Sequence, residues 1–114
     1  MVMTFEQGDI ISVDFDPQSG HEQGGRRPAI VVTNNLFNAK CSLAMVCPIT
    51  NIDKNHPFHI KLSLYEGLIT TGVVLCDQAR MLDLTSRKAV FKEKAPDALI
   101  IEVVDMITRF VEVS

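Results

Sequence analysis

The chain has 114 residues and a mass of 12.7 kDa, so we expect one domain, residues 1–114, with one hydrophobic core. Apolar residues make up 46% of the sequence and charged residues 22%, which excludes a disordered chain. No apolar run approaches the roughly 20 residues of a membrane span, and the N-terminus lacks the basic and apolar segments of a signal peptide. We therefore expect a cytoplasmic protein without a membrane partner.

The net charge of −3 is unevenly distributed along the chain. Residues 1–22 carry a net charge of −5, residues 23–92 one of +5, and residues 93–114 one of −3. The basic middle of the chain can form a positive groove while the rest stays acidic. The acidic balance therefore does not exclude a nucleic-acid partner.

The cysteines favour neither a disulfide framework nor a zinc site. They are odd in number, form no C-x-x-C pair and lie among apolar residues, at positions 41, 47 and 76. We expect three buried, reduced thiols.

The first half of the chain predicts three strands. Apolar and polar residues alternate over 10–15, and Pro17 ends this strand. The polar, glycine-rich segment 16–26 is a loop whose length is typical of functional loops. Two continuous apolar runs, typical of buried strands, follow: 29–33, stopped by the asparagine pair 34–35, and 43–47, stopped near Pro48, with a short turn at 36–40 between them.

The second half predicts shorter strands and then a helix. After a polar loop at 50–57, strand patterns occupy 58–62, 73–76, 81–84 and 89–91. From residue 97 the apolar residues recur at helical spacing, with Pro96 suited to the N1 position and an apolar arc wide enough to cover a sheet and contact a partner.

These elements predict a mainly β protein, a small and strongly bent sheet or β-barrel with a C-terminal α-helix packed on it. No crossover helices separate the strands, which excludes a parallel α/β sheet. Segment 34–42 is too short for the helix that a ferredoxin-like fold needs.

The loop before the second strand gathers acid/base and cationic side chains within seven residues, namely His21, Glu22, Arg26 and Arg27. Local composition alone favours a solvated surface loop. However, Arg27 directly precedes Pro28 at the first position of a buried strand, so a rigid element positions it. Glycines 24 and 25 also allow a backbone to approach a ligand closely.

Two further segments are candidates. Thr50 follows a buried strand, where a threonine is most often a turn or cap residue. Asp77, Gln78 and Arg80 leave another core strand, where an ordinary salt-bridged strand end is the simpler interpretation. His56 and His59 flank Pro57-Phe58, and in an extended chain they do not converge, so we expect no metal site.

The sequence contains no Walker loop, G-x-S-x-G elbow, H-E-x-x-H motif or EF-hand loop. The remaining groups, arginine with a carboxylate or histidine and a hydroxyl, suit phosphodiester chemistry on RNA without a cofactor. A base removes the proton of the 2′-OH, an arginine stabilises charge on the phosphate, and an acid protonates the leaving 5′-oxygen.

Three blocks of the chain closely resemble the MazF/PemK/Kid family of toxins. They are residues 8–32 with the specific Gly20-His21-Glu22-Gln23 to Arg27-Pro28 segment, residues 46–50, and residues 72–80. The resemblance implies a type II toxin, a sequence-specific, metal-independent endoribonuclease (an mRNA interferase) that cleaves single-stranded RNA, inhibiting translation and growth. Its products would carry a 2′,3′-cyclic phosphate and a 5′-hydroxyl.

The resemblance also implies an SH3-like barrel with short additional helices, a homodimer, and a MazE/PemI-like antitoxin whose C-terminal tail covers the RNA groove. By position, Arg27 and Thr50 match the family's catalytic arginine and threonine, and Glu22 its acidic residue. His21 and Asp77 match acid/base and RNA-contact positions of the Kid branch, which leaves the base open among Glu22, His21 and Asp77. The other expected RNA contacts are Gln23, Arg26, Gln78 and Arg80.

Two comparisons refine this expectation. The Kid branch has an arginine where this chain has Leu75, which favours Arg27 as the essential cation. CcdB toxins share the barrel but poison DNA gyrase by binding and depend on a tryptophan near the C-terminus, whereas this chain has none. A barrel that only binds an antitoxin is less favoured, because Arg27 and Thr50 are both present. We expect loops 16–26 and 50–57 to flank the groove and select bases.

Overall fold

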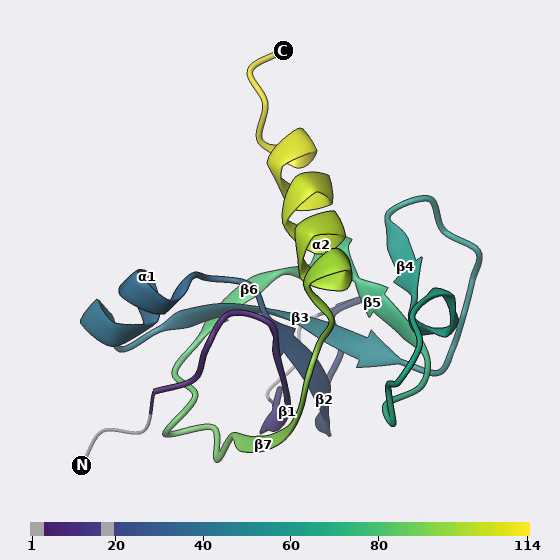
Figure 1. Cartoon of the computed structure of the whole chain (residues 1–114). Helices are drawn as coiled ribbons and strands as arrows, with labels where there is room; N and C mark the ends of the chain where they lie inside the picture. Colours follow the sequence, from purple (N-terminus) through teal and green to yellow (C-terminus); the bar gives the residue numbers. More distant parts are fainter. Residues whose placement is uncertain (1–3, 17–19) are drawn as a thin grey trace.

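The computed structural model describes residues 4–16 and 20–114, so the predicted strand end at Pro17 lies outside the described residues. In this part of the chain a seven-stranded antiparallel sheet is accompanied by two α-helices and two short 3-10 helices (Figure 1). The strands are β1 (Asp9–Asp14), β2 (Arg26–Val31), β3 (Ala44–Thr50), β4 (His59–Lys61), β5 (Val73–Leu75), β6 (Arg80–Leu82) and β7 (Val90–Lys94). The helices are α1 (Asn35–Lys40), η1 (Leu62–Leu64), η2 (Cys76–Gln78) and α2 (Asp97–Phe110).

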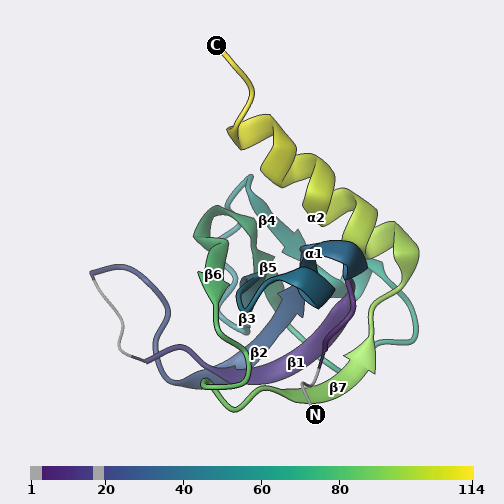
Figure 2. The ribbon, with the colours of Figure 1, turned by 90° about the vertical axis from the view of Figure 1, so that its left-hand side faces the viewer.

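The sheet is strongly curved, and its strands follow the order β4-β5-β3-β2-β1-β7, with β6 paired to β3 (Figure 2). This confirms the prediction of a mainly β fold with a C-terminal helix. Each predicted strand corresponds to an observed one, with ends shifted by at most three residues.

The central strands are buried on both faces, because alternate residues enter two separate cores. One core lies beneath α2 and contains Ile30 of β2 and Cys47 of β3. The other fills the concave face and contains Ala29 of β2, Val46 of β3 and Val13 of β1. Burial on both faces explains why β2 and β3 read as continuous apolar runs in the sequence.

Helix α1 occupies the segment that the sequence predicted to be a turn. The Asn34 side chain accepts a hydrogen bond from the Phe37 N–H at 2.9 Å, so this residue, expected to stop the preceding strand, also caps a helix. The helix has six residues and buries none of them, which is why no apolar periodicity marked it. The exclusion of a ferredoxin-like fold rested on a helix being absent here, but a single short surface helix does not supply that fold's packed layer.

Pro48 lies inside β3, so the prediction that the strand stops near it was wrong. Val46 is the last β3 residue that pairs with β6, and Ile49 is the first that pairs with β5. Pro48 therefore falls where β3 changes partner on one side, a position where a missing N–H interrupts neither ladder.

Helix α2 covers the sheet with Leu99, Ile100 and Val103, which are buried against β-strand residues. Pro96 is the N-cap rather than the expected N1 residue. The Tyr65 hydroxyl donates a hydrogen bond to a Glu102 carboxylate oxygen and ties the segment after η1 to this helix. In the part of the chain that the structure describes, no helix is long and apolar enough to cross a membrane.

The three cysteines are free, but only two of them are buried as expected. Cys41 is exposed because it follows α1 on the surface. Cys47 and Cys76 lie together in the core beneath α2, where a hydrogen bond with Cys76 and burial raise the pKa of Cys47 well above its usual value. The Cys47 thiol is therefore protonated at neutral pH.

Candidate active site

The sheet directs Arg27 and Thr50 to the same face. Strands β2 and β3 are antiparallel, and their pairing ends with Ala29 against Pro48. Arg27 and Thr50 lie two residues beyond this pair in their strands, so by alternation each points to the face of Ala29 and Pro48. Because Arg27 also pairs with Val13 of the concave core, this is the concave face, away from α2.

The neighbouring Arg26 points to the other face of β2. Its Nη2 donates hydrogen bonds to the Lys88 carbonyl at 2.7 Å and to the Ser12 carbonyl at 3.2 Å. Strand β2 begins at Arg26, three residues before the predicted run 29–33, and alternation then separates the two arginines. Of this pair, only Arg27 shares the face of Thr50.

Arg27 is held by the loop that precedes it. Its Nε donates a hydrogen bond to the Gly24 carbonyl at 2.9 Å, and the side chain is half-buried. This bond uses one of the five guanidinium N–H groups and leaves the terminal nitrogens of the side chain to meet a ligand. A planar fork of donors is suited to a phosphate.

Thr50 is buried at the end of β3, and only 7% of its surface is exposed. Its Oγ1 accepts a hydrogen bond from the Ile52 N–H at 3.3 Å, so the hydroxyl proton can point elsewhere. Gly72 packs against the backbone of Thr50 with φ of +113°, and a Cβ on Gly72 would lie 2.3 Å from the Thr50 carbonyl oxygen. Glycine at position 72 is therefore needed for Thr50 to occupy its place.

The loop that carries His21, Glu22 and Gln23 is joined to η2. The Gln23 N–H donates to Gln78 Oε1 at 3.0 Å, and Gln78 Nε2 contacts the His21 carbonyl at 3.5 Å. Between these segments lies a cavity of about 140 Å³. It is lined by Phe15, Glu22, Gln23, Pro48, Asp77, Gln78, Ala79 and Arg80.

Five of the nine residues expected at the site therefore line a single cavity. Pro48 also lines it, and Thr50 lies two residues further along the same face of β3. His21 is exposed on the loop beside the cavity and is not among its lining residues. The position that carries an arginine in the Kid branch is Leu75, which is buried at 2% exposure and supplies no polar group.

Arg80 stands at the cavity with an unused donor. Its Cζ lies 5.8 Å from the centre of the Phe15 ring, a cation–π arrangement that holds the guanidinium. Among the described residues, its Nη1 is one of two buried side-chain nitrogen or oxygen atoms without a hydrogen-bond partner. A buried guanidinium N–H without a partner suits an anionic oxygen of a ligand.

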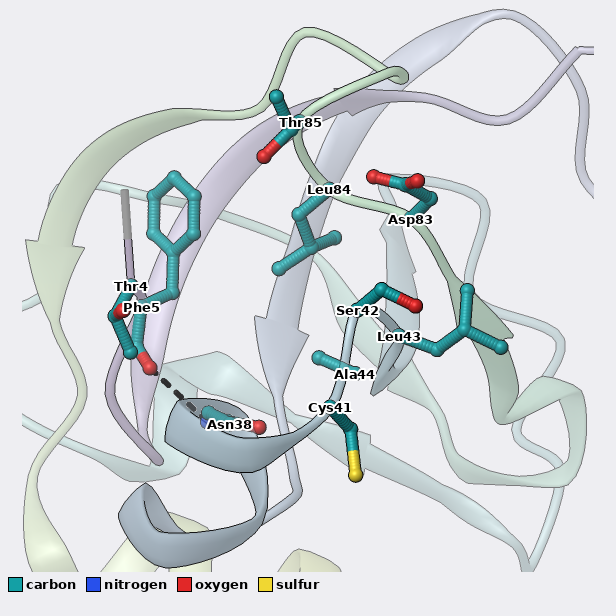
Figure 3. A pocket seen from close by; sticks show the side chains of 10 residues that line it. All are labelled: Thr4, Phe5, Asn38, Cys41, Ser42, Leu43, Ala44, Asp83, Leu84 and Thr85. Carbon is teal, nitrogen blue, oxygen red and sulfur yellow. Dashed lines mark hydrogen bonds between the residues drawn. The ribbon is translucent and has the colours of Figure 1, made fainter. Parts of the chain in front are cut away.

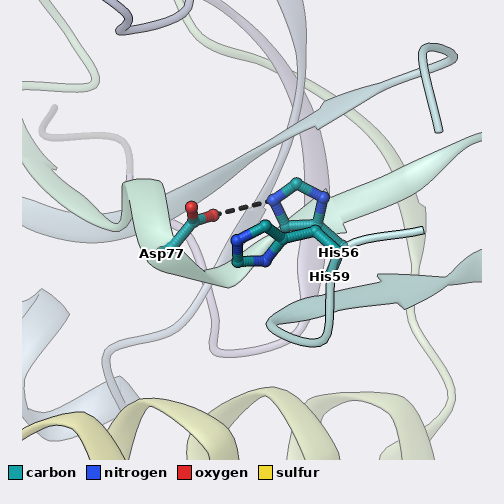
Figure 4. A group of neighbouring side chains, drawn as sticks. All are labelled: His56, His59 and Asp77. Atoms are coloured by element: carbon teal, nitrogen blue, oxygen red, sulfur yellow. Dashed lines mark hydrogen bonds and ion pairs between the residues drawn. The ribbon is translucent and has the colours of Figure 1, made fainter. Parts of the chain in front are cut away.

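Asp77 belongs to a second cluster that the sequence did not predict. Its Oδ1 accepts a hydrogen bond from His59 Nε2 at 2.9 Å, and the His56 ring stacks on the His59 ring with centres 4.6 Å apart (Figure 4). The expectation that the two histidines diverge was wrong. The His59 N–H donates to the His56 carbonyl at 3.1 Å, so the chain turns between them instead of remaining extended.

A larger cavity, of about 200 Å³, contains none of the residues expected at the site (Figure 3). It lies beside α1 and the segment after β6, with Phe5, Leu43, Ala44 and Leu84 among its lining residues. Asn38 Nδ2 donates to the Phe5 carbonyl at 3.0 Å at its edge, and the lining side chains have no grouping of arginine, hydroxyl and carboxylate comparable to that around Arg27. Size alone therefore does not locate the site.

Comparisons with known proteins agree with this fold. Residues 6–111 match the family described as PemK-like, MazF-like toxin of type II toxin-antitoxin system. The endoribonuclease toxin ChpB of Escherichia coli strain K12 is 41% identical over 112 residues, which cover 95% of each chain. A crystal structure of MazF from Deinococcus radiodurans superposes with a TM-score of 0.88 at 36% identity, covering 96% of this chain and 98% of that one. A MazE–MazF structure from the same organism gives a TM-score of 0.83 at 36% identity, covering 99% and 100%.

The chain thus belongs to the PemK/MazF family of type II toxin endoribonucleases. Sequence reasoning missed three supporting residues, namely Phe15 beneath Arg80, Gly72 against Thr50, and His59 beside Asp77. Phe15 and Gly72 carried a signal, since both stand in resembling blocks, but the contact of His59 with Asp77 depends on tertiary structure.

Proposed function

We propose that this toxin cleaves single-stranded RNA, including mRNA, in a sequence-specific and metal-independent reaction. The ribose 2′-OH attacks the adjacent phosphate and leaves a 2′,3′-cyclic phosphate and a 5′-hydroxyl. The single observation that carries this proposal is the shared face of Arg27 and Thr50, beside a cavity lined by Glu22, Asp77 and Arg80.

The groups present can supply each requirement of that reaction. The Arg27 guanidinium stabilises the charge that develops on the non-bridging phosphate oxygens, and the Thr50 hydroxyl donates to the same phosphate. Cleavage without a metal needs a base for the 2′-OH proton and an acid for the leaving 5′-oxygen. Glu22 and Asp77 line the cavity and His21 does not, which favours a carboxylate as the base.

RNA binding would use the same surface. Arg80 has a buried N–H without a protein partner among the described residues, and Gln23 and Gln78 present amides at the cavity. Arg26 lies on the opposite face of β2, so it would contact only RNA that extends beyond this cavity. Loops 16–26 and 50–57 would border the groove and select bases.

We also propose two protein partners. The Deinococcus MazF is seen with MazE, and by analogy a MazE/PemI-like antitoxin would lay its C-terminal tail over the groove of this chain. A homodimer is the second expectation. Apolar side chains of α2 that remain exposed, such as Ile101 at 67%, support a surface that contacts another chain.

The test is cleavage of a long RNA by the purified, untagged protein in EDTA, with mapping of the cut positions and chemical analysis of the ends. We expect cuts at a short recognised sequence, with 2′,3′-cyclic phosphate and 5′-hydroxyl ends. Loss of cleavage in EDTA, or 5′-phosphate ends, would contradict the mechanism. Inhibition of DNA gyrase without RNA cleavage would instead support a CcdB-like toxin.

A further inference from the structure

Three potential metal ligands converge beside the cavity of about 140 Å³, which one of them, Asp77, also lines. His56 lies in the loop before β4, His59 opens β4, and Asp77 lies in η2 (Figure 4). One ligand atom from each of these residues lies within 4.8 Å of the other two. The cluster thus joins two segments that are separated by the whole of η1 and β5.

His59 faces Asp77 within hydrogen-bond distance. Its side chain is only 9% exposed, and its Nε2 bonds to Asp77 Oδ1 at 2.9 Å. An ion would replace this hydrogen bond, so that the imidazole nitrogen and the carboxylate both become its ligands.

The loop that carries His56 is anchored by aromatic contacts. Phe58 meets the Phe110 ring of α2 edge-on with centres 4.8 Å apart, and His56 lies 5.4 Å from Phe58. His56 Nδ1 accepts a hydrogen bond from the Phe58 N–H at 3.1 Å, which leaves Nε2 as its free ligand atom. His56 is exposed, so its ring can move toward its neighbours without opening the core.

We propose that His56, His59 and Asp77 bind one Zn²⁺ ion per chain. Two imidazoles and one carboxylate form a donor set that suits Zn²⁺ and leaves a fourth position for water or another ligand. Tetrahedral bonds of about 2.1 Å place ligand atoms about 3.4 Å apart. His59 Nε2 and Asp77 Oδ1 would separate from 2.9 Å to this distance, and the other separations, of up to 4.8 Å, would close by a small movement of the exposed His56.

The site would act on the toxin through Asp77, and this consequence rests on the proposed function. Asp77 also lines the cavity assigned to RNA, so an ion that takes its carboxylate removes that carboxylate from the RNA. The ion would also fix the loop containing His56 to η2. Zinc would accordingly inhibit cleavage, while the reaction itself needs no metal.

Binding is tested on untagged protein without RNA, by Zn²⁺ titration in competition with a chromogenic chelator. The chain has three histidines, so His21→Asn is a matched control for His56→Asn and His59→Asn. We expect one Zn²⁺ per chain for the wild type and the control, and affinity lowered at least tenfold for both cluster variants. Because His56 is exposed, His56→Asn should fold normally, which circular dichroism can verify. No saturable binding, or equal binding by His56→Asn and the wild type, would overturn the site.

Cleavage assays separate this inference from the proposed function. Equimolar Zn²⁺ should inhibit the wild type reversibly, with activity restored by EDTA, and should not inhibit His56→Asn. A wild type that binds Zn²⁺ but cleaves at an unchanged rate would overturn the inhibitory role. A wild type that binds Zn²⁺ but never cleaves RNA would overturn the proposed function and leave the zinc site supported.

Discussion

The backbone N–H of Gln23 donates a hydrogen bond to Gln78 Oε1 at 3.0 Å, although 55 residues separate them in the chain. This bond ties the loop that carries Glu22 to η2, which carries Asp77, so the two carboxylates belong to one supported surface. Arg27, at the start of β2, also holds this loop, because its Nε donates a hydrogen bond to the Gly24 carbonyl. The proposed catalytic groups are therefore held by contacts between elements and not by a loose loop alone.

Replacing Arg27 with alanine should lower kcat for RNA cleavage by about 10²–10³-fold, because charge on the phosphate loses its stabilising guanidinium. Arg27→Lys should recover only part of the rate, since an ammonium lacks the planar fork of donors. Single-turnover cleavage of a short RNA measures both, with melting curves to verify the fold.

Arg109→Ala is the matched control for that substitution. Arg109 forms an exposed i,i+4 pair with Asp105 at 2.8 Å on α2, so its loss should leave cleavage unchanged and alter stability by less than about 0.5 kcal/mol. If Arg27→Ala cuts RNA as fast as Arg109→Ala does, the assignment of Arg27 is wrong.

Thr50→Val removes the hydroxyl with little change of shape and should reduce cleavage by about 10²-fold. Thr50→Ser keeps the hydroxyl and should stay within tenfold of the wild type. Both variants should fold, because Thr50 Oγ1 accepts only the local Ile52 N–H. Equal rates for the two variants in the same assay would show that the hydroxyl takes no part.

Gly72→Ala should destabilise the protein by about 3 kcal/mol or more, because the new Cβ would lie 2.3 Å from the Thr50 carbonyl oxygen in a backbone with positive φ. Gly67→Ala is the control, since Gly67 also has positive φ, +85°, but nothing lies within 4 Å of its Cβ position. That change should cost about 1–2 kcal/mol. Urea unfolding measures the free energy of unfolding of both variants. Equal decreases for the two would show that the contact with Thr50 is unimportant.

Tyr65 should ionise well above the usual tyrosine range. Burial, followed by the hydrogen bond and the negative charge of Glu102, raises the pKa of Tyr65 to about 12. The stability that this contact contributes is present below pH 10 and is lost as the pH rises through about 12. The chain has one tyrosine and no tryptophan, so absorbance near 295 nm follows Tyr65 alone.

Glu102→Gln should move the titration midpoint of Tyr65 toward 10 without reaching it, because the burial remains. Circular dichroism recorded at each pH verifies that the titrated protein is still folded. A wild-type midpoint near 10 in the folded protein, or a midpoint that Glu102→Gln leaves in place, would contradict the tie between this residue and α2.

The fold was largely predictable because the core strands carry strong patterns. Strand β1 alternates, and β2 and β3 are continuous apolar runs since both of their faces are buried. Helix α1 was missed because six residues without a buried side chain show no periodicity, and the Asn34 cap resembles a strand stop. The end of β3 was wrongly placed near Pro48. This proline lies where β3 changes its pairing partner from β6 to β5, and the sequence of a single strand does not show such a change.

The site was only partly predictable. The residues around Arg27 and Thr50 were found through motif blocks, but their shared face depends on the pairing register of β2 and β3. The separation of Arg26 from Arg27 follows from strand alternation once the strand is known to begin at Arg26. The contact of His59 with Asp77 joins two elements, and no local pattern encodes it.

The most direct test of the account uses two RNA substrates that differ at one atom. Both carry the recognised sequence, and one has 2′-deoxyribose only at the nucleotide whose 2′-OH would attack the scissile phosphate. If the ribose 2′-OH is the nucleophile, the all-ribose RNA is cut at this phosphate in EDTA, and the deoxy-substituted RNA binds but stays intact. Cleavage of the deoxy-substituted RNA at the same phosphate would show that another nucleophile acts and would contradict the account.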